Sequence, residues 1–580
     1  MKKRVLTLTF GALMAISILA GCGRTNENNF VEVKLPDFPQ TVDDGRDSWE
    51  HDNSAYDFTW YVDDSNFTYP TYGTDAISAK ITEKTGATIK FISPVTDDGE
   101  KLSTMIAGNA LPDVISINAG SQTYSQLAMQ GYTYPMNDLI DRWAPSFNDK
   151  LHDDVFSWFE LGNGKTYGFP NFAYSNDYVG EAEKFEPNAA ILVREDWYNE
   201  ATSAIGSDMT TKASFKQGVQ WIVNKYGRDT VGMLLDQFTI DGNASINLMA
   251  QYFAAKYEST DGKYNYRQTD PKYLEALQFL NDCYKAGFIT DANFSNNASQ
   301  IRTTLASGKV FASLVTSQNY SQAFKTCYNS GITYVPLVLR NDAGDDPILQ
   351  DAQGMGYLIT MVTTNAKRPD KIIKLLEFLY SEEGQRLVCF GVEDSTWRWT
   401  DSTKTEIEWT QTYLSAVEND MSGGYGLYGM TLLMDLAYTN KIKPLNGRKG
   451  PDIYIDNLKR PLSPYSYNYT PSFLKLDTQD KDFFKLTTAA TRITQKWAEY
   501  FPRILRANDN AKAKEVYDSA IAYLKQRQLE EVIVFQAAGY ERAKTALGIT
   551  NGWPTHVPGY VSPVTGPHGD FSYWRGATHA

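Results

Sequence analysis

Up to about residue 400, short apolar runs alternate with segments whose apolar residues recur every three or four positions. The runs are rich in β-branched and aromatic residues, as strands are, and the recurring pattern is typical of amphipathic helices. Strands are predicted at 58–62, 88–92 and 113–117, with helices at 74–86 and 100–108. Alternation of this kind favours a parallel sheet with helices packed on its faces.

The same alternation begins again after residue 188. One of its helices has clear ends, because Asp270 and Pro271 stand at its start and Gly287 follows its last turn. The other strands are predicted at 189–193, 230–235, 308–315, 332–338 and 354–361, and the other helices at 215–226, 243–255 and 370–380. Two α/β units are therefore expected.

Beyond about residue 400 the alternation ends and helical patterns predominate. Helices are predicted at 406–417, 487–500, 511–527 and 530–547, and a loop-rich passage at 441–473. Residues 550–580 are rich in Gly, Pro, His and aromatic residues without a period, so an irregular tail is expected there.

The start of the chain has the features of a secretory signal peptide: basic residues at 2–4 and an apolar run at 5–18. Cys22 follows Leu-Ala-Gly directly, which resembles the lipobox of bacterial lipoproteins. The resemblance implies removal of residues 1–21, a lipid on Cys22, an anchored linker at 22–56 and a body at the extracellular face of the cell membrane. The alternative is an ordinary signal peptide that has a cysteine near its end.

The chain is acidic, with 55 basic and 69 acidic residues and a net charge of −14, or about −17 once the three basic residues at 2–4 are removed (−14 − 3). This balance argues against nucleic acid as a partner. Cys283, Cys327 and Cys389 lack C-x-x-C spacing and the five histidines lack metal-ligand spacing, so neither a metal nor a cofactor is predicted. The acidic segment 477–482 lacks the glycine and glutamate of a calcium loop and is expected to be a solvated turn.

Aromatic residues make up 13% of the chain, and Tyr and Trp suit ligands that have both apolar faces and hydroxyl groups. Ligands of α/β sheets bind beyond the carboxyl ends of strands. Trp397 and Trp399 are candidate stacking platforms, because alternate residues of an extended segment face the same side. The other ligand-binding candidates follow predicted strands: Trp60, Tyr72, Asp75, Asn118, Ser121 and Tyr124 in the first unit, and Asp236, Gln237, Gln318, Asn319 and Tyr320 in the second. Capping or turn formation is the alternative role for the polar candidates, and core packing for the tryptophans.

A series of short strings in a fixed order resembles the extracellular solute-binding proteins of bacterial ABC importers. The resemblance is to the large carbohydrate-binding lipoproteins of Gram-positive bacteria, which are related to maltose-binding protein. The strings lie at 73–86, 106–115, 164–170, 194–197, 280–289, 307–310 and 368–384.

The resemblance implies a class II periplasmic-binding-protein-like α/β fold, in which two lobes are joined by a hinge and extra helices follow at the C-terminal end. We expect lobe 1 at 57–187 and 332–395, and lobe 2 at 188–331 and 396–549. It also implies a monomer without catalytic residues that captures an oligosaccharide between the lobes and delivers it to the permease of an ABC importer. The alternatives are a surface-anchored glycoside hydrolase and a lipoprotein that binds peptide or cell-wall polymer without transport.

Overall fold

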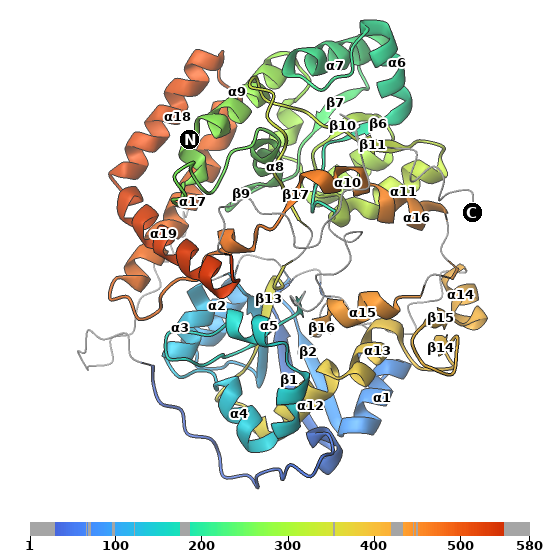
Figure 1. Cartoon of the computed structure of the whole chain (residues 1–580), viewed down its shortest axis with the longest axis vertical. Coiled ribbons are helices and arrows are strands. Elements are labelled where there is room, and N and C mark those ends of the chain that lie inside the picture. The colour runs from blue at the N-terminus through green and yellow to red at the C-terminus, as the bar shows by residue number, and fades with distance from the viewer. Residues whose placement is uncertain are drawn as a thin grey trace, which may run out of the picture.

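The computed structural model describes residues 30–64, 67, 71–95, 99–120, 122–173, 186–351, 354–418, 433–444, 446–447 and 450–549. The chain forms two lobes, one above the other in Figure 1, and each is built around its own sheet. Cys22, Ser121 and the tail 550–580 lie outside the described residues. None of the helices in the described ranges is long and apolar enough to cross a membrane.

The first lobe contains a five-stranded sheet in the order β2-β1-β3-β13-β4. β1 runs parallel to β2 and β3, whereas β13 is antiparallel to both of its neighbours. The strands are β1 (Tyr56–Val62), β2 (Ala87–Ile92), β3 (Val114–Asn118), β4 (Phe169–Pro170) and β13 (Leu358–Val362). The helices are α1 (Ala76–Thr85), α2 (Glu100–Ala107), α3 (Gln122–Met129), α4 (Met136–Trp143), α5 (Asp153–Trp158), α12 (Pro369–Tyr380) and α13 (Glu382–Phe390).

The second lobe contains a four-stranded sheet in the order β11-β6-β10-β7. Its strands are β6 (Leu192–Arg194), β7 (Val231–Leu234), β10 (Val310–Ser313) and β11 (Tyr334–Pro336). Its helices are α6 (Glu195–Ile205), α7 (Lys212–Tyr226), α8 (Ala244–Tyr252), α9 (Pro271–Lys285), α10 (Ala298–Ala306), α11 (Ser321–Asn329), α16 (Gly450–Asn457), α17 (Phe483–Leu505), α18 (Asn510–Lys525) and α19 (Leu529–Ala546). Two short strands, β8 (Phe238–Thr239) and β9 (Gly242–Asn243), form a hairpin before α8.

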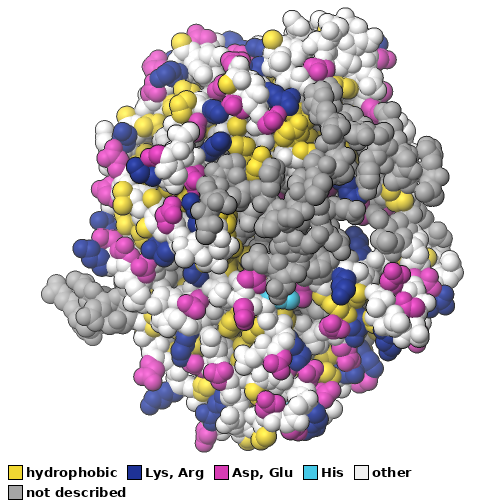
Figure 2. Space-filling view, in the orientation of Figure 1, with side chains coloured by type: hydrophobic (Ala, Val, Ile, Leu, Met, Phe, Trp, Pro, Cys, Tyr) yellow, Lys and Arg dark blue, Asp and Glu magenta, His cyan; other side chains and the backbone are white. Residues whose placement is uncertain are grey.

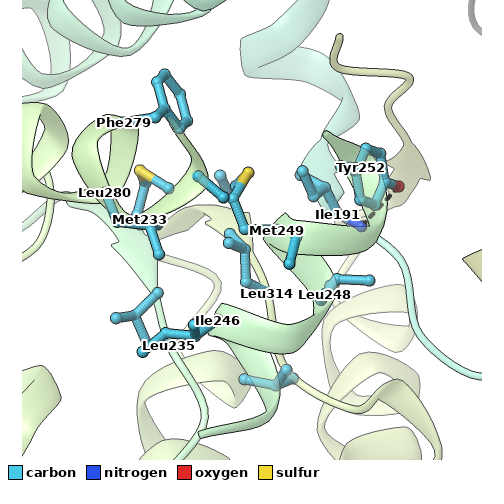
Figure 3. Close-up of a cluster of buried hydrophobic side chains, with 14 of the residues drawn as sticks. Ile191, Met233, Leu235, Ile246, Leu248, Met249, Tyr252, Phe279, Leu280 and Leu314 are labelled. Atoms are coloured by element: carbon cyan, nitrogen blue, oxygen red, sulfur yellow. Dashed lines mark hydrogen bonds between the residues drawn. The ribbon is translucent and has the colours of Figure 1, made fainter. Parts of the chain in front are cut away.

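The core of the second lobe lies between its sheet and helices α8 and α9 (Figure 3). Met233 and Leu280 point toward one another there, from a strand and a helix respectively. The Tyr252 hydroxyl accepts a hydrogen bond from the Ile191 amide at 3.0 Å, which satisfies a backbone donor inside this apolar layer.

The ends of two helices lie where the sequence predicts them, because capping residues at those ends fix them. The Asp75 side chain accepts from the amides of Ile77 and Ser78 at the start of α1, and Gly86, in the left-handed conformation at φ 73°, ends it. Asp270 likewise caps α9, with Pro271 in its first turn. The predicted alternation of strands and helices before residue 400 is confirmed in both lobes.

The predicted division at residue 332 is too early, because β11 pairs with β6 of the second sheet. The assignment of everything after residue 395 to the second lobe also needs correction. β14 (Trp397–Trp399) and β15 (Ile407–Trp409) form a hairpin whose side chains pack with Phe390 at the end of α13. The predicted helix at 406–417 therefore begins with a strand, and only α14 (Gln411–Glu418) is helical.

Residues 433–442 also belong to the first lobe. β16 (Met434–Asp435) pairs in parallel with β5 (Phe172–Ala173), and α15 (Leu436–Ile442) follows it. Ile442 packs in the same apolar cluster as Trp397. The chain thus returns to the second lobe only at α16.

The described part of the predicted linker at 22–56 is not a spacer, because it packs along the first lobe (Figure 1). The Val31 amide donates to the Met129 carbonyl at 2.9 Å. Trp49, in the short helix Ser48–His51, is buried edge-on against Phe378 of α12, with ring centroids 5.0 Å apart. The segment is rich in polar residues, but its apolar side chains are sufficient to hold it against the first lobe.

The hinge between the lobes is a group of short paired segments. The Asn188 amide donates to the Gln350 carbonyl at 2.7 Å, and Pro187 lies opposite Asp351 in an antiparallel bridge. β12 (Leu349–Gln350) also pairs in parallel with β17 (Ser466–Tyr467). The chain segments that connect the two lobes are therefore hydrogen-bonded to one another at the hinge.

Candidate functional site

A cavity of about 550 Å³ lies between the two lobes. The first lobe contributes the loop after β3, the end of α5 and the segment before β13, whereas the second contributes residues 316–319 and 473–478. The hinge residues Asn188, Gln350 and Asp351 line it as well. This volume suits a small organic ligand of a few rings.

Two aromatic rings on the cavity wall are exposed. Tyr357 of the first lobe is 46% exposed and Phe473 of the second lobe is 57% exposed. Trp158 and Phe172 add half-buried rings from the first lobe. Large exposed aromatic side chains on both walls are typical of a ligand site rather than of a packing defect.

Tyr357 is held in place by the loop behind it. Asn171 is fully buried, and its side-chain oxygen accepts from the amides of Tyr357 and Leu358 at 3.1 and 3.0 Å. Gly356 has a φ of 76°, and a Cβ there would lie 2.7 Å from that oxygen, so only glycine fits. The Tyr357 hydroxyl donates to Asp64 at 3.1 Å. The ring is therefore fixed before any ligand arrives.

Gln318 and Asn319 line the cavity from the short helix Ser317–Tyr320 in the second lobe. Asp236 fixes this helix, because its carboxylate accepts from the Thr316 amide at 3.1 Å and from the Tyr320 hydroxyl at 2.9 Å. Two amide side chains that both donate and accept hydrogen bonds are thereby presented to the cavity.

Asp351 lines the cavity at the hinge and is only 2% exposed. The Tyr469 amide donates to its Oδ1 at 3.4 Å, whereas its Oδ2 has no hydrogen-bond partner. Burial raises the pKa of this carboxyl to about 7. The cavity wall therefore contains an acid that changes its charge near neutral pH.

Among the predicted ligand-binding residues, the structure brings Tyr124, Gln318 and Asn319 to the cavity. Tyr124 is mostly buried, and its hydroxyl donates to the Phe159 carbonyl at 2.7 Å, so it chiefly supports the wall. Asp236 and Tyr320 support the neighbouring helix, as described above. Gln237 is half-buried and is not part of the cavity wall.

The other first-lobe candidates have structural roles. Trp60 is fully buried within the lobe and donates from its indole nitrogen to Ser116 Oγ at 2.8 Å. The Tyr72 hydroxyl donates to the Ala87 carbonyl, and Asp75 caps α1. The Asn118 side chain accepts from the Gly120 amide and so shapes the loop that lines the cavity.

Trp397 and Trp399 do lie on one side of their strand, with ring centroids 5.3 Å apart. Their surroundings exclude them from the cavity, because Trp397 is 2% exposed and donates to the Gly391 carbonyl at 2.8 Å. The Arg386 guanidinium covers the ring of Trp399. The pair is a packing contact between the hairpin and α13.

Tyr357, Phe473 and Asp351 were not among the predicted ligand-binding residues. Those candidates were chosen at the carboxyl ends of predicted strands. Because β13 is antiparallel to β3, the amino end of β13, where Tyr357 lies, is at the same edge of the sheet as the carboxyl end of β3. The Gly-Met-Gly sequence at 354–356, directly before a strand, could have indicated a loop that holds a functional side chain.

The described face of the molecule shows acidic and basic side chains interspersed over both lobes (Figure 2). Within the described ranges, no group of three or more His, Cys, Asp or Glu side chains is placed to hold a metal ion. The described cysteines, Cys283, Cys327 and Cys389, are free.

Three solved structures with a similar fold are distant from this chain in sequence. The alginate-binding protein AlgQ2 is 15% identical, with a TM-score of 0.63, and the match covers 86% of this chain and all of that one. The S. pneumoniae ABC-transporter substrate-binding protein FusA, solved with kestose, is 16% identical with a TM-score of 0.64, over 84% of this chain and all of that one. An extracellular solute-binding protein from Bifidobacterium longum subsp. infantis is 14% identical with a TM-score of 0.60, over 84% of this chain and 98% of that one.

No curated protein matches the sequence. A family model described as bacterial extracellular solute-binding protein does match, over residues 76–389. That range begins at α1 and ends within α13, so it includes the whole sheet of the second lobe and every strand of the first-lobe sheet except β1. The cavity-wall segment 473–478 lies beyond it. This chain belongs to the bacterial extracellular solute-binding protein family.

Proposed function

We propose that this protein captures a neutral oligosaccharide between its lobes and delivers it to the permease of an ABC importer. The observation that carries the proposal is the cavity with exposed aromatic rings on both walls, Tyr357 on one and Phe473 on the other. Sugar rings present C–H faces that lie on aromatic rings, and their hydroxyls need partners such as Gln318 and Asn319. A ligand that touches both walls favours closure of the lobes.

The charges on the cavity wall support a neutral ligand. Among the described lining residues, only Glu160, Asp351 and Lys475 have acidic or basic side chains of the Asp, Glu, Lys or Arg type. The Lys475 ammonium donates to three backbone carbonyls, at 2.7, 3.0 and 3.4 Å, so its donors are in use. A carboxylate of an acidic sugar would be desolvated there without a cationic partner, which is costly.

The signal sequence and Cys22 support a lipid anchor at the extracellular face of the membrane. Phe30, eight residues after Cys22, already packs against Tyr167 of the first lobe. Eight residues span at most about 29 Å, so the anchor would keep the first lobe close to the membrane and its permease. We expect the protein to act as a monomer.

The proposal is tested by titrating the protein with a panel of neutral oligosaccharides while assaying the mixture for new reducing ends. We expect saturable binding without release of reducing ends. Release would instead indicate the glycoside hydrolase that the sequence left open, and binding of peptides with no saccharide binding would indicate a peptide receptor.

A further inference from the structure

One side of the cavity is closed by polar contacts that cross directly from one lobe to the other. Lys475 Nζ donates to the carbonyls of Ser157, Trp158 and Glu160, and the Gly162 amide donates to Thr478 Oγ1 at 2.9 Å. Gln122 Nε2 donates to Thr491 Oγ1 of α17 at 3.1 Å. We call these contacts the lobe seam.

The main bond of the seam joins an ammonium of one lobe to a helix end of the other. Ser157 and Trp158 are the last residues of α5, whose final carbonyls lack a full set of partners within the helix. A cation at that end also interacts favourably with the helix dipole. Lys475 is half-buried, and partial burial lowers the pKa of its ammonium.

The backbone of Lys475 is fixed to α19 of the second lobe. Its amide donates to the Gly539 carbonyl at 3.0 Å, and its carbonyl accepts from Arg542 Nε at 2.9 Å. Figure 1 shows α19 extending from the second lobe toward the first. The side chain of Lys475 therefore links the position of the C-terminal helix to the first lobe.

The lobes approach one another closely at Gly162. A Cβ at this position would lie 2.6 Å from Gln479 Cγ and 2.7 Å from Thr478 Oγ1, both on the opposite side of the seam. The backbone of Gly162 does not itself require glycine, because its φ is outside the left-handed region. The glycine is explained by the contact between the lobes.

We propose that Lys475 is a positioning residue that holds the lobes together around the cavity before a ligand binds. In this account α19 and the loop before α17 set the resting arrangement of the lobes through the seam. A protein whose binding-competent arrangement is already populated binds more tightly, because less of the binding free energy is used for closure. The inference depends on the proposed function only in that closure serves ligand capture.

Hydrogen exchange on the ligand-free full-length protein tests this directly. In Lys475→Met and Gly162→Ala we expect amide exchange at 157–162 and around Gln122 to become about tenfold faster or more. Lys475→Met removes the bonds from a charged group, whereas the added Cβ of Gly162→Ala would lie 2.6 Å from Gln479 Cγ and so pushes the lobes apart at this contact. Lys475→Arg should restore protection, since its guanidinium also donates to carbonyls. Lys485→Met is the control, because this exposed lysine pairs only loosely with Asp482 of its own segment, at 3.7 Å.

The proposal is overturned if both variants leave exchange at the seam unchanged. It is also overturned if exchange in β1 accelerates as much as at the seam, because Lys475 would then act on global stability. Neither result depends on a ligand, so a failure here is distinct from a failure to bind oligosaccharides.

Discussion

Tyr357 and Phe473 present exposed aromatic rings to the same cavity from different lobes, although 116 positions separate them in sequence (473 − 357). A ring on each wall allows a sugar to be held on two faces. This relationship makes capture of a sugar by closure of the lobes physically reasonable.

Replacing either ring by alanine should weaken binding of a neutral oligosaccharide about 10- to 100-fold. The expected loss is that of burying one aromatic side chain, about 1.5–3 kcal/mol. Calorimetry on Tyr357→Ala and Phe473→Ala measures it. Tyr226→Ala is a matched control, because that ring is 36% exposed on α7 and is not part of the cavity wall. An equal effect in the control would show that the losses come from altered folding.

Acidic oligosaccharides should bind about 100-fold more weakly than neutral ones of the same length. The described lining offers an acid at Asp351 and one lysine whose donors are in use, so a uronate would be buried unpaired. Competition between a neutral oligosaccharide and an oligouronate measures the ratio. Comparable affinities for the neutral and the acidic oligosaccharide would contradict the inference that the described cavity lining offers no free cationic partner.

Asp351→Asn should stabilise the protein at high pH more than at low pH. The pKa of the folded carboxyl, about 7, lies above the unfolded value, so the native state binds the extra proton between about pH 4 and pH 7. Wild-type stability from this group is therefore present at low pH and falls as the pH rises through that window, by about 1.4 kcal/mol per unit. Denaturant unfolding at pH 5 and pH 8 measures the difference.

Asp241→Asn, on the exposed turn between β8 and β9, is the control for this pH dependence. It should leave the stability difference between pH 5 and pH 8 as in the wild type. A wild-type curve that Asp351→Asn leaves unaltered would mean that Asp351 stays ionised in the folded protein.

Trp49→Ala should destabilise the first lobe by about 3 kcal/mol, the usual cost of removing a buried tryptophan. Trp49 packs against Phe378, and the neighbouring Ser48 amide donates to Ser146 Oγ at 2.8 Å. Denaturant unfolding measures the change. Unaltered stability would show that the segment before β1 is only loosely attached.

The sequence predicts the elements well where the signal is local. Asp75 and Gly86, or Asp270 and Pro271, fix helix ends through their own chemistry, and the structure confirms them. The candidate site was predicted less well because the face on which a side chain lies is decided by distant contacts. The position of Trp60 in its strand is one that a ligand-facing residue could also have. Helices cover the faces of that sheet, however, so the Trp60 ring lies in the core.

The hairpin at 397–409 was assigned to the wrong lobe for the same reason. Trp397 and Trp399 do lie on one side of their strand, as predicted, but that side packs against helix α13. Tyr357 depends on the antiparallel direction of β13, and Phe473 on how the segment after β17 packs against α19. None of these relationships can be predicted from the local pattern of apolar and polar residues.

The most direct test of the central claim is calorimetric titration of neutral tri- to hexasaccharides into the wild-type protein and into the Tyr357→Ala/Phe473→Ala double variant. The account predicts saturable binding of one ligand per wild-type molecule and its loss in the double variant, with both proteins folded. Equal binding by the two proteins, or no saccharide binding by the wild type, would contradict it.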